Sequence, residues 1–322
     1  MNNNTGLDLK LIADNCCLYS NVDTSIIISK IDELKNTYNE KDLIAIYNYM
    51  LSTTQNPDLI MYLIHCVDVY RDTSSLEVLV DILLLKNGNY QDPAVKEKFV
   101  NVRAMCAKAI ANQKNTDVVS SLLYCLNNKD EHYKVRLACA DALGRIGDRF
   151  AVAPLIDVVK DEDEKSVYLR ESAASALGLL GDARALDPLV SILETKQGIL
   201  DKFTFLKERA IEALIKMGFS DNERVYKALK NSLSDESSQV RINAIEALME
   251  SDNPKAYETI KKCLDEDSDE EVKKNALIAL YNMSDRTILD EVIKSDKYSD
   301  TLKMEAVAIL DEYESDDEGI EE

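Results

Sequence analysis

The sequence predicts an all-α protein made of about eight stacked pairs of antiparallel helices. Three observations support this. One block recurs seven times in the 322 residues, and each copy carries two amphipathic helices. The composition, with 46% apolar residues, nine Gly and five Pro, allows a sizeable core but has too few turn residues for an all-β fold. Repetition at a period of roughly 20–50 residues is typical of arrays that grow by stacking.

The repeat is clearest around residues 135–144, VRLACADALG, when its basic residue is taken as an anchor. The residue before each anchor is Val or Leu, the third after it is Ala or Cys, and the seventh is Leu or Ile. These positions form one stripe of a helix with 3.6 residues per turn. We call the helix that carries the anchor the B helix of its pair and the helix before it the A helix. Successive anchors are 33, 34, 37, 34, 32 and 30 residues apart: Arg103, Arg136, Arg170, Lys207, Arg241, Lys273 and Lys303.

Caps and periodicity place the elements in order along the chain. Gly147, Gly181 and Gly218 follow B helices where a left-handed cap belongs. Asp148 and Asp182 come next and are expected to cap the following A helix. The expected capping helix is 22–38, and the expected pairs are 40–52/56–71, 74–87/95–111, 115–128/133–147, 150–161/167–181, 183–196/202–218, 221–233/237–250, 254–265/269–282 and 285–295/299–313.

The chain divides into four predicted regions. Residues 1–39 form N-terminal capping helices, 40–94 form divergent repeats, and 95–313 form the regular array. Residues 314–322 are expected to be an acidic, disordered tail, because the last twelve residues hold eight acids and no base.

An acid stands six residues before most anchors, in the turn that enters the B helix. We expect a structural ladder in which anchors and acids alternate from repeat to repeat, for example Arg136 with Asp130 and Arg241 with Asp235. The alternative is a row of Arg side chains that binds phosphates, and the alternating acids favour the structural interpretation. The ladder residues are Arg103, Arg136, Arg170, Lys207, Arg241, Lys273, Asp130, Asp201, Asp235 and Asp267.

The pattern P-L-x5-D…V-R-x2-A-A-x-A-L-G-x2-G resembles the HEAT repeat, and in particular the bacterial subgroup named after phycobilisome-lyase HEAT-like repeats. The resemblance is strong over 115–250, good over 95–313 and weak before 95. It implies an α-solenoid, a right-handed superhelix of about eight pairs, in which B helices line the concave face and A helices the convex face.

Charge and composition exclude several classes of function. Net charge is −21, of which residues 162–322 carry −17, so binding of nucleic acid by phosphate neutralisation is not expected. A HEAT-like DNA glycosylase is excluded for the same reason and because Trp is absent. The absence of a signal segment and of any CxxC, together with seven Cys, indicates a cytoplasmic protein that does not insert into membranes.

Motifs for catalysis are missing from the sequence, so we expect a protein that is not an enzyme and holds no cofactor or metal. The two His are not followed by Glu, unlike the paired His-Glu motifs of deoxyhypusine hydroxylase, a di-iron HEAT enzyme. We expect His132 in a solvated turn and His65 packed in the core. Cys106 and Cys139 occupy a slot that is otherwise Ala and are expected to fill the core.

The favoured function is a scaffold or adaptor that binds a protein or peptide, basic or amphipathic, on the concave face. An alternative is a bilin (phycobiliprotein) lyase or lyase subunit of the HEAT-like type, and a plain solvated face is the simplest interpretation of these positions. The loop 197–205 is unusually apolar and explains the 37-residue spacing. The candidate contact residues are Asp141, Arg145, Ser175, Glu208, Glu212, Glu246 and Glu250 on B helices, with Ile199 and Phe203 in the loop.

Overall fold

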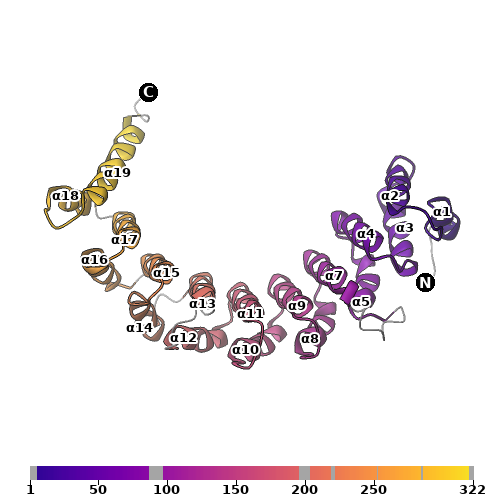
Figure 1. Ribbon diagram of the computed structural model, residues 1–322, viewed down its shortest axis with the longest axis horizontal. Coiled ribbons are helices and arrows are strands. Elements are labelled where there is room, and N and C mark those ends of the chain that lie inside the picture. Colours follow the sequence, from indigo (N-terminus) through magenta and orange to yellow (C-terminus); the bar gives the residue numbers. More distant parts are fainter. Residues whose placement is uncertain are drawn as a thin grey trace. The chain divides into compact units, whose positions relative to one another are not determined.

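The computed structural model describes residues 6–86, 97–195, 204–218, 222–251, 253–283 and 286–318, with side chains to residue 311 (Figure 1). All regular secondary structure in these residues is helical. The chain divides into two compact units, unit 1 at Met1–Ala176 and unit 2 at Leu177–Glu322.

Unit 1 begins with two capping helices and continues with helix pairs. The pairs α3/α4, α5/α7 and α8/α9 each pack together, and α7 also packs on α4 and α9. Figure 1 shows α7 and α9 in one row and α8 and α10 in a second row. The helices are α1 (Leu9–Asn15), α2 (Thr24–Glu33), α3 (Glu40–Thr53), α4 (Pro57–Tyr70), α5 (Leu76–Leu83), α7 (Val100–Asn112), α8 (Val119–Asn127), α9 (Tyr133–Ile146), α10 (Val152–Lys160) and α11 (Val167–Leu180), which continues into unit 2.

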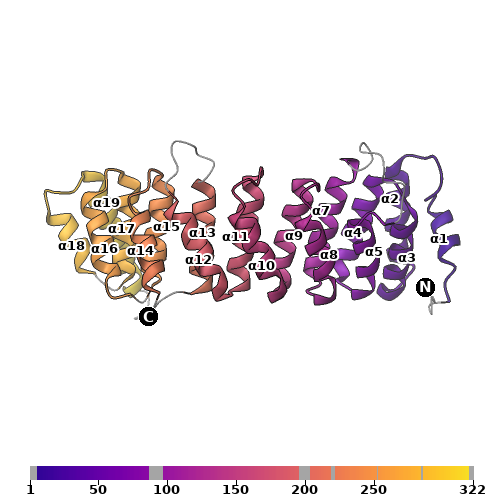
Figure 2. The same ribbon diagram turned by 90° about the horizontal axis from the view of Figure 1, so that it is seen from below.

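Unit 2 consists of four further pairs. Figures 1 and 2 show the B helices α13, α15 and α17 side by side in one row and the A helices α12, α14 and α16 in another. Consecutive B helices pack on each other as well as on their own A helix. The helices are α12 (Leu186–Glu194), α13 (Thr204–Met217), α14 (Glu223–Ser232), α15 (Ser238–Met249), α16 (Ala256–Glu266), α17 (Glu270–Asn282), α18 (Thr287–Lys294) and α19 (Asp300–Glu318).

These helices confirm the predicted α-solenoid of stacked antiparallel pairs. Most of the expected bounds differ from the observed ones by one to three residues. The A helix expected at 74–87 ends early, at Leu83, and α7 begins at Val100. The expected start of this B helix, residue 95, lies outside the described residues. The short helix α1 was not expected as a separate element. Of the predicted acidic tail, residues 319–322 lie outside the described residues.

Several A helices are entered through a 3-10 turn that a polar side chain caps. Asp148 Oδ1 accepts the backbone N–H of Phe150, 2.9 Å away, and Asp182 Oδ1 accepts that of Arg184 at 3.0 Å. The turns are η2 (Thr73–Ser75), η3 (Thr116–Val118), η4 (Arg149–Ala151) and η5 (Ala183–Ala185), and η1 (Leu34–Asn36) follows α2. The predicted caps are therefore confirmed, because a carboxylate satisfies amides that a helix start leaves unpaired.

Close packing between successive B helices explains the small residues of the repeat. Cys106, Cys139 and Ala210, three residues after their anchors, are fully buried. A Cβ added to Gly144 in α9 would lie 2.7 Å from Cα of Ala176 in α11, so only glycine fits there. Gly147, which ends α9, has a φ of +84°, the left-handed conformation that glycine adopts without strain.

Candidate functional site

The basic anchors of the B helices form ion pairs with acids of the following repeat. The sequence predicts that Arg136 pairs with Asp130 and that Arg241 pairs with Asp235. The structure instead joins four of the anchors to an acid 26–28 residues downstream. The distances are 2.5 Å for Arg103 Nη2–Glu131 Oε2, 2.7 Å for Arg136 Nη1–Glu164 Oε2, 2.5 Å for Lys207 Nζ–Asp235 Oδ2 and 2.9 Å for Arg241 Nε–Asp267 Oδ2.

Three arginines of this ladder also bind the end of their own A helix. Arg136 Nε donates to the carbonyl oxygen of Leu126 at 2.9 Å, and Arg170 Nε donates to that of Val159 at 3.0 Å. Arg103 Nε binds the carbonyl of Leu83 at 2.7 Å in the same way. One guanidinium therefore ties together its own B helix, the A helix of the same pair and, through the acid, the next pair.

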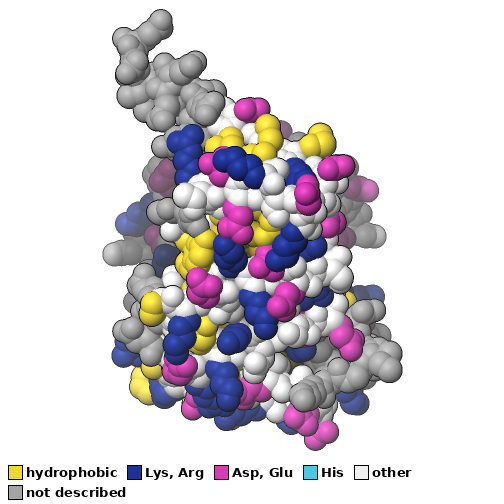
Figure 3. Space-filling model, turned by 90° about the vertical axis from the view of Figure 1, so that its left-hand side faces the viewer, with side chains coloured by type: hydrophobic (Ala, Val, Ile, Leu, Met, Phe, Trp, Pro, Cys, Tyr) yellow, Lys and Arg dark blue, Asp and Glu magenta, His cyan; other side chains and the backbone are white. Residues whose placement is uncertain are grey.

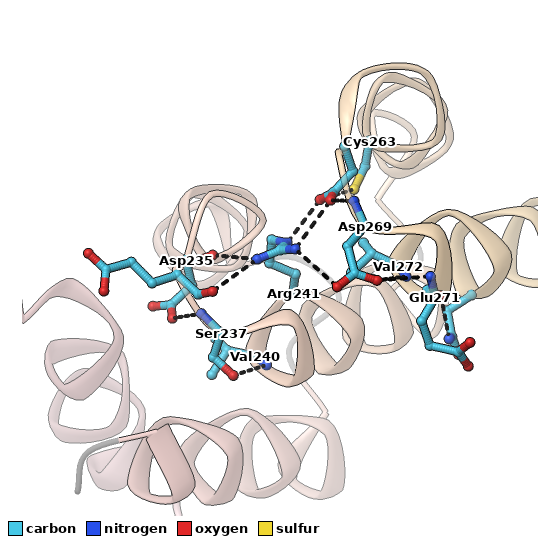
Figure 4. A network of polar contacts seen from close by, with 11 residues as sticks. Asp235, Ser237, Val240, Arg241, Cys263, Asp269, Glu271 and Val272 are labelled. Carbon is cyan, nitrogen blue, oxygen red and sulfur yellow. Dashed lines mark hydrogen bonds and ion pairs between the residues drawn. The ribbon is translucent and has the colours of Figure 1, made fainter. Parts of the chain in front are cut away.

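Arg241 binds the turn before its own B helix and the acid of the next repeat (Figure 4). Its Nη1 donates to the backbone oxygen of Asp235 at 2.9 Å, while Nε and Nη2 bind the two carboxylate oxygens of Asp267. Asp267 Oδ1 also accepts the N–H of Asp269, and Asp269 then caps α17 by accepting the N–H groups of Glu271 and Val272. The acid that pairs with an anchor thus also shapes the turn that starts the next B helix.

Three predicted ladder residues lie elsewhere. Asp130 is exposed, and its neighbour Glu131 forms the ion pair with Arg103 instead. Asp201 lies outside the described residues. Lys273 contacts Glu270 of its own helix at 3.7 Å, because the position that supplies the acid in other repeats is Lys297 in the next one.

The rungs are largely shielded from water. The side chains of Arg136 and Glu164 are 7% and 8% exposed. Burial opposes the charged form of Arg103, but the hydrogen bonds and the charge of Glu131 outweigh it and raise the pKa of Arg103. The guanidinium nitrogens are engaged by carbonyls and carboxylates, and this arrangement suits stacking of repeats better than capture of a phosphate.

In unit 1, the candidate residues on the B helices mainly bind one another or their neighbours. Asp141 accepts a hydrogen bond of 2.6 Å from Ser172 Oγ, and Arg145 Nη1 donates to Asn112 Oδ1 at 3.2 Å. Asn112 in turn binds Asp68 at 2.8 Å. Ser175 is half-buried. These contacts fix the side chains between successive B helices.

In unit 2, two of the four candidate acids are not free for a partner. Glu208 was expected at the surface, but it is only 7% exposed. It lies one residue after an anchor, a position that is at least half-buried in five other repeats because the next B helix packs beside it. Burial raises the pKa of Glu208, with Glu212 adding to this and Arg209 opposing it. Glu212 itself binds Arg209 Nη1 at 2.6 Å.

Glu246 and Glu250 are the remaining acids, and both are exposed on α15. Within the described part of unit 2, neither carboxylate makes an ion pair. The adjacent helix α17 presents Ile278, which is 38% exposed, and Ile242 of α15 is half-buried. Unneutralised carboxylates therefore lie on the same row of B helices as exposed apolar side chains. We call this surface, defined by Ile242, Glu246, Glu250 and Ile278, the acidic B face.

Two of the candidate contact residues belong to the loop 197–205. Ile199 and Phe203 lie outside the described residues. Phe205, expected in the same loop, is in the first turn of α13 and is 56% exposed. On α19, Met304 is 73% exposed and Val307 is 42% exposed.

The two histidines lie in different surroundings. His65 was expected in the core but is exposed on α4, since the buried stripe of this helix runs through Ile64 and Val67 instead. His132 caps α9, where its Nδ1 accepts the N–H of Lys134 at 3.2 Å, and it stacks on Tyr133. No cluster of three or more His, Cys, Asp or Glu able to hold a metal occurs within the described ranges.

The cysteines are reduced, and most are buried. Cys106, Cys125, Cys139 and Cys263 lie in the core, as expected for small fillers. Burial raises the pKa of the Cys106 thiol, and it raises that of Cys263 to about 11, which disfavours the thiolate. Nowhere in the described stretches does a helix have the length and apolar character that crossing a bilayer requires.

Comparison with known proteins agrees with this architecture. The HEAT-repeat family model matches residues 92–167, 129–205 and 200–281, which together span more than half of the chain. No curated protein matches the chain.

Three solved structures are among those that match the chain. The CpcE–CpcF complex of phycocyanin lyase from Nostoc sp. PCC7120 is 22% identical, with 74% of this chain and 87% of that chain covered and a TM-score of 0.43. Human deoxyhypusine hydroxylase with glycerol is 17% identical over 86% of this chain and 96% of that chain, at 0.35. A Kap121p mutant is 13% identical over 93% of this chain and 37% of that chain, and its TM-score of 0.54 supports the shared fold.

Proposed function

The chain belongs to the HEAT-repeat family, and from this premise we propose that it is a non-catalytic scaffold whose acidic B face binds a basic or amphipathic protein segment. The fold by itself assigns no function. The observation that carries the proposal is the exposure of Glu246 and Glu250, free of ion pairs in the described part of unit 2, beside the apolar Ile278.

The chemistry of the acidic B face favours a cationic partner. Two other acids on B helices form ion pairs with neighbours, Glu212 with Arg209 and Glu305 with Lys274. Carboxylates without such partners stay hydrated, and their negative electrostatic potential attracts Lys and Arg side chains over a distance of about one Debye length. Exposed Ile side chains then supply the apolar contact that a purely electrostatic encounter lacks.

The proposal is tested by affinity capture from cells that naturally express the chain, followed by quantitative mass spectrometry. The wild-type chain is compared with Glu246→Lys/Glu250→Lys and with a matched control, Glu236→Lys/Glu258→Lys. The control changes the charge equally at exposed acids away from the acidic B face. A protein that the wild type and the control retain, and that the first variant loses, supports the proposal.

Two outcomes would contradict it. Equal recovery of every bound protein by the three chains would show that the acidic B face is not the binding surface. Recovery of a coloured tetrapyrrole adduct with the purified chain would favour the lyase alternative, which no residue of the acidic B face supports.

A further inference from the structure

The helix α19, the last B helix that the structure describes, exposes the face on which another repeat would stack. In the internal B helices, the residue four positions after the anchor is 0–1% exposed because the next B helix covers it. In α19 the equivalent residue is Val307, and it is 42% exposed. The internal residues at this position are Ala107, Ala140, Ala174, Ile211, Ile245 and Leu277.

A hollow of about 530 Å³ runs along this face. Met304, one residue after the anchor, is 73% exposed and lies in the hollow with Val307 and Ala308. Figure 3 looks onto this end of unit 2 and shows hydrophobic side chains exposed between charged ones. The described residues that line the hollow are Asp300, Lys303, Met304, Val307, Ala308 and Asp311.

The anchor of α19, Lys303, also lacks an acidic partner like those of the ladder. Arg103, Arg136 and Arg241 each pair with an acid from the turn that precedes the next B helix. Lys303 occupies the same position and makes no ion pair with any described residue. Its side chain borders the hollow beside Met304 and Val307. The face thus combines an uncovered apolar stripe with a base that would meet a carboxylate if a helix stacked there.

The surrounding charge indicates what kind of helix fits. Asp300 and Asp311 flank the apolar stripe, and the sequence from residue 311 onward holds eight acids and no base. Two copies of α19 facing each other would bring these acids together, which is unfavourable. A helix with basic flanks would be attracted instead.

We propose that α19 docks an amphipathic helix from a partner protein, stacked as the next B helix would be. The partner helix places small and branched apolar side chains on Met304 and Val307. A carboxylate just before its first turn binds Lys303, and its Lys or Arg side chains face Asp300 and Asp311. This site is separate from the acidic B face and extends the scaffold by one helix at the end of unit 2.

The probe for this site is taken from the chain itself. A fluorescein-labelled peptide of residues 128–147, with Cys139→Ala, contains α9, the helix that covers the equivalent face of α7. It carries Glu131, the acid that binds the anchor Arg103, and its four basic and three acidic residues give it a slight positive charge. Binding to the full chain is followed by fluorescence anisotropy.

We expect Met304→Glu and Val307→Glu each to weaken peptide binding at least about tenfold, since a charge would have to be buried under the docked helix. Val69→Glu is the matched control, because Val69 is 67% exposed on α4, outside this face. It should leave the affinity unchanged, as should Glu246→Lys/Glu250→Lys, which separates this site from the acidic B face. Circular dichroism verifies that each variant keeps its helix content.

A charge exchange tests the Lys303 rung. Lys303→Glu should weaken binding of the peptide, and the peptide with Glu131→Lys should recover at least half of the lost affinity. Equal affinity of the wild type and the Met304 and Val307 variants would overturn the proposal. So would a concentration-dependent dimer of the wild-type chain, seen by sedimentation velocity and lost in Val307→Glu, because the occupant would then be a second copy.

Discussion

An arginine anchor stabilises this fold by joining three segments that are far apart in sequence. The Arg136 guanidinium binds the carbonyl at the end of α8 and the carboxylate of Glu164 in the turn before α11. Glu164 Oε1 also accepts the N–H of Ser166, so the turn is fixed from both sides. Because both charges are almost fully buried, removing one of them leaves the other without compensation.

The first prediction concerns this pair. Arg136→Ala should destabilise the surrounding repeats by about 3–5 kcal/mol, the usual cost of an unpaired buried charge. Lys35→Ala, which removes an exposed pair with Asp32, should cost about 0–1 kcal/mol. Native-state hydrogen exchange of the amides in α9 and α2 measures the two losses locally. Similar losses in both would show that the ladder contributes no more than a surface ion pair.

The second prediction concerns Glu208 and pH. Its pKa is raised in the folded chain by burial, so the folded state holds its proton more tightly than the unfolded state does. Stability from this group is therefore present at low pH and is lost as pH rises through the raised pKa. Glu208→Gln removes the effect and should stabilise the chain more at pH 7 than at pH 4.

Thermal unfolding at the two pH values measures this difference. Glu246→Gln, at an exposed carboxylate on the neighbouring B helix, is the matched control. A Glu208→Gln variant with the same stability relative to wild type at both pH values would mean that the burial of Glu208 has no energetic consequence.

The third prediction compares two buried positions of α9. Cys139 stands where most repeats have Ala, so Cys139→Ala should cost less than about 1.5 kcal/mol. Leu143 is fully buried, and Leu143→Ala should cost about 2–5 kcal/mol through lost burial and the resulting cavity. Urea titration monitored by circular dichroism ranks the two, and equal costs would contradict the assignment of the repeat positions.

At the scale of single helices, the sequence predicts most of the fold because each pair repeats the same local signals. Apolar periodicity marks the buried stripe, and Asp148 and Gly147 mark where one helix ends and the next begins. Helix α1 is harder to predict, since it spans seven residues and precedes the repeats. The early end of α5 also follows from local geometry, because Leu85 adopts a positive φ of 55°.

The partners within the ladder are not predictable from the pattern. Acids at a fixed distance before each anchor suggest a pairing within one repeat, and stacking brings the next repeat's acid closer. Arg241 illustrates both contacts, because it binds the backbone oxygen of Asp235 and the carboxylate of Asp267. The burial of Glu208 is not predictable for the same reason, because Glu208 is buried by contact with the next B helix and not by its own repeat.

The fourth prediction concerns the contact between α9 and α11. Gly144→Val should cost about 1–3 kcal/mol, since even a Cβ would lie 2.7 Å from Cα of Ala176 and the helices must separate. Gly147→Ala meets no atom within 4 Å and should cost only the strain of its left-handed backbone, about 1–2 kcal/mol. Thermal unfolding followed by circular dichroism compares them, and a Gly144→Val variant as stable as wild type would contradict this packing.

At the scale of the whole molecule, charge is the feature that connects fold and function. Residues 162–322 carry −17 of the net −21, and within the described part of unit 2 the carboxylates of Glu246 and Glu250 remain without an ion pair. A field of this sign accelerates association with a basic partner and weakens as salt screens it. In the ladder, in contrast, the acids and bases neutralise each other, and their ion pairs stabilise the stacking of the repeats.

Binding of a partner at the acidic B face is tested by the association rate of the captured partner with the chain, measured by surface plasmon resonance from low to high salt. Glu246→Lys/Glu250→Lys should slow association on the order of tenfold at low salt and flatten the salt dependence. Glu236→Lys/Glu258→Lys should retain most of the wild-type rate. Unchanged association kinetics in the correctly folded first variant would contradict the claim that the acidic B face receives the partner.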